Sequence, residues 1–248
     1  MVNRRLRAFF FIFMSQVTSQ ELSFDNCVKV FDYHKQKYPT KFFDTDDFFF
    51  VLDRGHYLDS EGAKGRNDIN LLDDLWIAVN RSTGFYMAVK ANCDPSFIIR
   101  NGQPLAKLDP GVFRAYRGDH KGDYFAFRPF PEGVRLPCTR NGVRSDCADT
   151  NGHGCKDIVD GIGYDTWSAG CFTQPITFFK NTFQPKCYEQ IENFHRTIDL
   201  KAKNERKLGS KKFDNAGVKH FPVILLEKRI AGGKQRIFSA TGEIVPIY

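Results

Sequence analysis

The clearest structural pattern in the chain is Trp76-Ile77-Ala78-Val79, followed by Asn80-Arg81-Ser82-Thr83-Gly84 and then Phe85-Tyr86-Met87-Ala88-Val89. Two apolar runs rich in aromatic and β-branched residues, joined by a polar turn with a glycine, are typical of a β-hairpin. Many short strands at close spacing predict a mainly β fold, a β-sandwich or barrel with a few peripheral helices. The other expected strands are 47–53, 112–116, 124–127, and a final hairpin of 221–227 and 236–238 that closes the sheet.

Helical periodicity is confined to a few segments. Residues 22–37 carry apolar positions at helical spacing, and Ser23 or Asp25 can cap the start. Pro39 ends this segment, which we expect to pack on the main body of the protein. Two further helices are expected at residues 175–180 and 187–198.

The first twenty residues have the pattern of an export signal. Arg4, Arg5 and Arg7 form a charged start, residues 8–14 an apolar run, and residues 15–20 a polar exit. The apolar run is too short to cross a bilayer as a helix, so no stable membrane anchor is expected. The expected organisation is a signal peptide at 1–19, a helical extension at 20–45, and one domain at 46–248 with a flexible insertion near 201–219.

Charge and cysteine content also favour an exported protein. The net charge of +7 suits an anionic surface such as a cell wall, and the scattered basic residues do not predict a nucleic-acid groove. Seven cysteines are most useful in an oxidising compartment, and up to three disulfides are possible once Cys171 is set aside. Cys138 and Cys147 flank the turn-like Arg140-Asn141-Gly142 and are the easiest pair to join. We expect a periplasmic or cell-envelope monomer.

A candidate nucleophile lies in Trp167-Ser168-Ala169-Gly170-Cys171. A cysteine attacks a carbonyl as the thiolate and therefore needs a neighbouring imidazole, for which His153 is the candidate. Gly170 can adopt backbone angles that aim consecutive N–H groups at an oxyanion, and Ser168 can add a hydroxyl donor. A lone cysteine is more often a buried small apolar residue or half of a disulfide, and that alternative stays open.

A series of short motifs accompanies this pair in a fixed order. The series resembles the L,D-transpeptidase (YkuD-type) catalytic domain family, in the variant found in phages and bacteria. The resemblance covers residues 48–195. The motifs are Arg54-Gly55, Asn67-Asp68, Asp73-Asp74, Asn92-Cys93-Asp94-Pro95-Ser96, Gly118-Asp119-His120-Lys121-Gly122, His153-Gly154 and Ser168-Ala169-Gly170-Cys171.

The resemblance implies an enzyme that acts on peptidoglycan stem peptides through a thioester acyl-enzyme. Cys171 would be the nucleophile and His153 the base, with Gly170, Ser168 and the Cys171 amide around the oxyanion. No metal or organic cofactor is needed. An amine acceptor gives transpeptidation, whereas water gives endopeptidase or carboxypeptidase activity. The chain departs from the better-known transpeptidases after the cysteine, where Phe172-Thr173-Gln174 replaces Ile-Arg.

Several alternatives stay open at this point. The chain can be a non-catalytic wall-binding or structural module with Cys171 in a disulfide, and His120, expected in a turn, is the second choice for the base. Asp149 to Asp160 nearly follows a calcium-loop pattern, although a histidine stands at an oxygen-ligand position. The cysteine spacings do not favour structural zinc. The polar residues of a long surface connection, Asn67, Asp68, Asp73 and Asp74, are expected to solvate the loop or to pair with Arg54.

Overall fold

The computed structural model describes residues 22–55, 72–95, 99–100, 103–120, 124–148, 150–155, 157, 170–191, 218–231 and 234–238. The described part begins with helix α1 (Phe24–Lys37), which is capped by Ser23 and followed by the 3₁₀ helix η1 (Pro39–Lys41). The predicted first helix is therefore confirmed. Three further helical segments follow residue 175, namely α2 (Ile176–Phe178), the π-helical η2 (Phe179–Phe183) and α3 (Gln184–Glu189).

Strands make up most of the remaining described structure. They are β1 (Phe48–Arg54), β2 (Asp74–Asn80), β3 (Phe85–Ala91), β4 (Ile99–Arg100), β5 (Gln103–Pro104), β6 (Lys107–Leu108), β7 (Gly111–His120), β8 (Tyr124–Phe130), β9 (Leu136–Arg140), β10 (Val143–Cys147), β11 (Gly152–Cys155), β12 (Phe172–Pro175), β13 (His220–Ala231) and β14 (Lys234–Phe238). The predicted β2–β3 hairpin is confirmed, with Trp76 opposite Val89.

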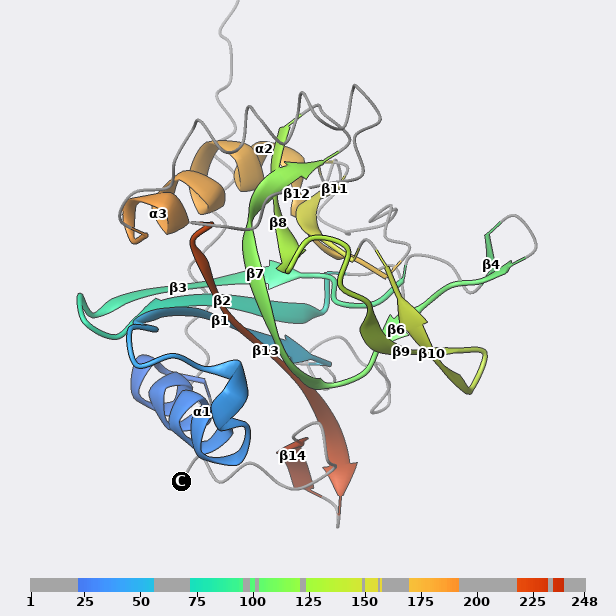
Figure 1. The fold of residues 1–248 in the computed structure, drawn as a ribbon. Coiled ribbons are helices and arrows are strands. Elements are labelled where there is room, and N and C mark those ends of the chain that lie inside the picture. Colours follow the sequence, from blue (N-terminus) through green and yellow to red (C-terminus); the bar gives the residue numbers. More distant parts are fainter. Residues whose placement is uncertain are drawn as a thin grey trace, which may run out of the picture.

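The main sheet curves into a nearly closed barrel (Figure 1). Its order is β12-β11-β8-β7-β13-β1-β2-β3, with β14 paired to β13. The two ends meet where Asn92, just after β3, exchanges backbone hydrogen bonds of 2.9 and 2.8 Å with Thr173 of β12. The prediction of a mainly β fold with few helices is confirmed, and of the two architectures expected the barrel is the one formed.

Alternation along β1 explains why the phenylalanine run at residues 48–50 is entirely buried. Phe48 and Phe50 point into the barrel, where Phe50 packs edge-on against Trp76 at 5.3 Å between ring centroids. Phe49 points to the other face and packs on Phe31 of α1 at 4.7 Å. The strand therefore separates two apolar layers, one inside the barrel and one under α1, which Figure 1 shows beside β1.

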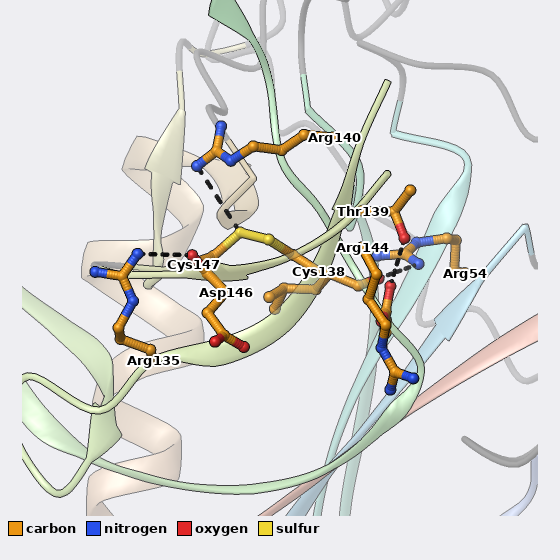
Figure 2. Close-up of a disulfide and its surroundings, with 10 residues drawn as sticks. Arg54, Arg135, Cys138, Thr139, Arg140, Arg144, Asp146 and Cys147 are labelled. Atoms are coloured by element: carbon orange, nitrogen blue, oxygen red, sulfur yellow. Dashed lines mark hydrogen bonds and ion pairs between the residues drawn. A yellow bond between two sulfur atoms is a disulfide. The ribbon is translucent and has the colours of Figure 1, made fainter. Parts of the chain in front are cut away.

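A small three-stranded sheet of β6, β9 and β10 lies at one side of the barrel. Its β9–β10 hairpin turns at Asn141 and Gly142, both with positive φ, and carries the disulfide Cys138–Cys147. Figure 2 shows this disulfide with Arg140 pointing towards the Cys147 sulfur, 3.9 Å away. The predicted pairing of these two cysteines is confirmed.

The other five cysteines are free thiols: Cys27, Cys93, Cys155, Cys171 and Cys187. The structure thus forms one of the three disulfides that the cysteine count allows. Cys27 lies in the layer under α1 and Cys187 in the layer inside the barrel, so the sheet separates these two thiols.

Several expectations are wrong in their details. β13 does not close the sheet but lies inside it, between β1 and β7, because it pairs in parallel with β1 and antiparallel with β7. The helix expected at 187–198 has already ended at Glu189. The surface connection was expected to run from Arg54 to Asp74, but both of these residues belong to strands. Arg54 ends β1, Asp74 begins β2, and both are fully buried.

Other predictions fall outside the described residues. These are the signal peptide at 1–19, Ser168, the pair Asn67-Asp68, the calcium-loop positions Asp149 and Asp160, and most of the insertion at 201–219. Among the described helices, none has both the length and the apolar character needed to cross a membrane.

Candidate active site

His153 lies on β11, a short strand in which glycine precedes and follows the histidine. A Cβ atom on Gly152 would lie 2.4 Å from the Trp76 ring, and one on Gly154 would lie 2.8 Å from the Ile176 Cα. The absence of a side chain at both glycines therefore allows the β11 backbone to pack closely against Trp76 and Ile176. Because side chains alternate along a strand, the His153 imidazole points to the opposite face.

Cys171 immediately precedes β12, which runs parallel to β11 and pairs His153 with Thr173. The two strands are joined next to the cysteine, where the Phe172 amide donates to the Asn151 carbonyl at 2.9 Å. The Asn151 amide in turn donates to the Cys171 sulfur at 3.4 Å. The thiol is free and partly exposed, so the expected disulfide of the non-catalytic alternative is not formed.

The Cys171 thiol has an unusual electrostatic environment. Burial alone would raise its pKa, but the His153 charge and hydrogen bond, the Asn151 amide and the Arg128 charge together hold the pKa below the usual 9.0. Burial instead raises the pKa of Cys27, Cys93 and Cys187, so those thiols stay protonated. Of these four thiols, Cys171 is therefore the one whose pKa is lowered, which favours the thiolate.

The His153 ring is held by neighbours from three strands. Its Nδ1 donates to the Gly154 carbonyl at 2.7 Å, because a carbonyl can only accept, and this bond leaves Nε2 as the basic nitrogen. The Tyr124 hydroxyl donates to the same carbonyl at 3.1 Å. His120 stacks on His153 with 4.3 Å between ring centroids and 18° between the planes.

The prediction that His120 lies in a turn is wrong. It is the last residue of β7, paired with Tyr124 of β8, and this register brings its ring to His153. A glycine near each side favoured the turn prediction, but Gly118 belongs to the strand and lies against Arg128, where a Cβ would be 2.5 Å from Cδ. Tyr124 was not expected at the site, since a strand tyrosine carries no local signal of such a role.

Gly170 has a backbone conformation that favours glycine. Its φ is +121°, a region that side-chain-bearing residues rarely adopt, and a Cβ there would lie 2.5 Å from the Ala106 carbonyl oxygen. The backbone therefore turns sharply at the residue before Cys171, with Ala106 against it. Such a turn can direct the Gly170 and Cys171 N–H groups towards a developing oxyanion.

No family model, curated protein or solved structure matches the chain. The function is therefore inferred from the geometry of the site and from the order of its motifs. Within the described residues, no group of three or more His, Cys, Asp or Glu side chains is arranged to hold a metal ion.

Described residues from three of the other motifs, those that contain Arg54, Asp74 and Asp94, meet in a second buried cluster. Arg54 forms an ion pair with Asp94 at 3.2 Å, and Asp74 accepts hydrogen bonds from the Gly55 and Cys93 amides at 2.6 and 2.5 Å. Burial, with the charges of Asp94 and Asp73, raises the Asp74 pKa well above its usual value. Asp74 is therefore not the ion-pair partner that was expected for Arg54: Arg54 pairs with Asp94, and Asp74 binds backbone amides instead.

Proposed function

We propose that the chain is a cysteine-dependent acyl transferase or hydrolase that acts on peptidoglycan stem peptides through a thioester acyl-enzyme. The observation that carries the proposal is the free, partly exposed Cys171 thiol whose pKa is lowered chiefly, against the effect of burial, by His153. A cysteine whose thiol pKa is lowered ionises more readily, and the thiolate is the nucleophile in acyl transfer. Structural cysteines, by contrast, are buried and protonated.

Each residue of the site has a definite role in this chemistry. The Cys171 sulfur attacks the amide carbonyl while the proton of its thiol passes to Nε2 of His153. The carbonyl oxygen gains the negative charge and accepts hydrogen bonds from the Gly170 and Cys171 amides. Collapse breaks the C–N bond, and His153 returns the proton to the leaving amine, which leaves a thioester on Cys171.

An amine or a water molecule then attacks the thioester carbonyl and releases Cys171 as the thiol. His153 removes the proton of this acceptor and returns it to the sulfur. An amine acceptor produces a cross-link, and water produces an endopeptidase or carboxypeptidase. No step requires a metal ion, an oxidant or an organic cofactor.

The substrate class comes from the resemblance to the L,D-transpeptidases. The motif order from Arg54-Gly55 to Ser168-Ala169-Gly170-Cys171 supports it, and so does the contact between His153 and Cys171. Such a substrate requires an exported protein, and the disulfide Cys138–Cys147 is consistent with an oxidising compartment. Thr173 stands where the better-known enzymes carry an arginine, so a different residue is expected to hold the substrate.

The test is intact-mass analysis of the protein after incubation with purified stem tetrapeptides. The wild type is expected to form a transient adduct with the mass of the acyl donor. Cys171→Ala should form no adduct, and His153→Gln should form it at least about 10²-fold more slowly, the usual share of a general base. Product analysis in the presence of a labelled amino acid or of labelled water separates transfer from hydrolysis.

Cys187→Ala is the matched control, because it removes another free thiol that is buried in the core. It should keep the adduct and the rate of the wild type. Product formation by a folded Cys171→Ala variant at the wild-type rate would exclude the proposed mechanism. Intact peptides with every protein would exclude the substrate class.

A further inference from the structure

The buried cluster around Arg54 contacts the cysteine segment through backbone on both sides. Arg54 is completely buried, and its guanidinium makes three different contacts. It pairs with Asp94 at 3.2 Å and donates to the carbonyls of Cys93 at 2.9 Å and Leu108 at 2.8 Å. One side chain therefore joins two segments, 92–94 and 106–108, that are distant from β1 in sequence.

The first of these segments is bound to the strand that follows Cys171. Asn92 exchanges both backbone hydrogen bonds with Thr173, two residues after the cysteine. The Asn92 side chain also accepts a hydrogen bond from the Asp94 amide at 2.9 Å, which shapes the turn that brings Asp94 to Arg54. A shift of segment 92–94 would thus move β12 directly.

The second segment lies against the residue that precedes Cys171. The Ala106 carbonyl oxygen occupies the space beside Gly170, close enough that a Cβ there would be 2.5 Å away. The neighbouring Lys107 pairs with Glu227 of β13 at 2.9 Å and with Asp94 at 3.8 Å. Segment 106–108 is therefore fixed by Arg54 on one side and by Lys107 on the other.

From this arrangement we infer that Arg54 is a positioning residue for Cys171, and that it acts through the backbone of segments 92–94 and 106–108. Arginine suits this role, because its planar fork donates in several fixed directions and keeps its charge when buried. Lysine at the same place would keep the charge but could not reach Asp94 and both carbonyls in the same geometry. The inference rests on Cys171 being the reactive group of the proposed function.

The test measures how fast iodoacetamide alkylates Cys171 across the pH range, with the modified residue identified by peptide mass mapping. The other four free thiols are buried, so alkylation of the folded protein reports on Cys171. Arg54→Lys is expected to raise the apparent pKa of the thiol and to slow its alkylation at neutral pH by about tenfold, since one pKa unit changes the thiolate fraction tenfold. Lys107→Met, at the half-exposed end of the network, should change the same profile in the same direction.

Arg114→Lys is the control for a purely structural effect. Arg114 is also a buried arginine, paired with Asp46 through both its terminal nitrogens at 2.7 Å, but its other side-chain hydrogen bonds go to Lys41 and His220 and not to the two segments. It should lower the melting temperature and leave the alkylation profile unchanged. A wild-type profile for folded Arg54→Lys, or an equal change with Arg114→Lys, would overturn the inference.

Two further outcomes are also decisive. If Arg54→Lys does not fold, a wild-type profile for Lys107→Met overturns the inference, and a raised thiol pKa supports it. Because alkylation requires no peptide substrate, the result is independent of the substrate class. If the wild type is inert towards stem peptides and Arg54→Lys has a raised thiol pKa, the proposed substrate class is excluded and the positioning role is retained.

Discussion

Replacing Gly170 with alanine perturbs the site at the point where its backbone geometry is most constrained. The native φ of +121° disfavours any residue with a side chain, and the added methyl would lie 2.5 Å from the Ala106 carbonyl oxygen. Ordinary contact begins at 3.4 Å, so the two segments must separate by nearly 1 Å or the backbone must rotate. Either response moves the amide groups on which the oxyanion would depend.

The expected magnitudes follow from these two effects. Backbone strain of this kind costs about 1–3 kcal/mol. In a chain of this size each kcal/mol lowers the melting temperature by about 2–4 °C, so a fall of roughly 2–12 °C is expected. A displacement of about 1 Å at a reacting centre reduces the rate by about 10²-fold. The variant should therefore fold, yet be far more impaired in thioester formation than in stability.

The assay is the rate of adduct formation with a stem tetrapeptide, measured beside a thermal melt. Gly84→Ala is the control, because Gly84 also has a positive φ, +73°, but a Cβ there meets no atom within 4 Å and the residue lies in the β2–β3 turn. It should lose similar stability and keep the wild-type rate. Equal rates for Gly170→Ala and the wild type would refute the argument that the Gly170 conformation serves the oxyanion.

Two predictions concern stability. Burial, opposed by a hydrogen bond to Val30 and assisted by Lys37, lowers the pKa of His34 from 6.5 to about 4, so protons bind more readily to the unfolded chain. The folded state should therefore lose about 2 kcal/mol of unfolding free energy as the pH falls from above 6.5 to about 5, measured as a lower urea midpoint, and His34→Leu should flatten this dependence. The disulfide between Cys138 and Cys147 restricts a short loop of the unfolded chain. The double variant Cys138→Ala/Cys147→Ala should therefore lose about 2–3 kcal/mol of unfolding free energy, measured in the same urea titration. No difference between the double variant and the wild type would show that the hairpin is held without its disulfide.

Local pattern was sufficient for much of the fold. The β2–β3 hairpin is encoded within 14 consecutive residues by two apolar runs and a glycine turn, and β1 by its phenylalanine run. The position of β13 could not be obtained in this way, because its pairing with β1 joins residues far apart in sequence. Apolar alternation identifies a strand but does not identify its neighbours.

In the candidate site too, local sequence predicts some features, whereas others depend on contacts between residues far apart in sequence. Chemistry of residue types suggested Cys171 and His153, and the structure brings them into contact. The stacking of His120 on His153 depends on the register of β7 with β8, which no local signal reports. The ion pair of Arg54 with Asp94 likewise connects two motifs whose separation in sequence conceals their contact.

The place of Cys171 in the barrel explains why so many motifs surround it. Strands β1, β2 and β12 are all buried along their length, and β12 is the end strand that meets Asn92 through a single bridge. Cys171 comes directly before this strand and is partly exposed, but a strand of four residues has few backbone hydrogen bonds with which to fix its own position. Backbone contacts on both sides of Cys171, joined through Arg54, supply the rigidity that the strand itself lacks.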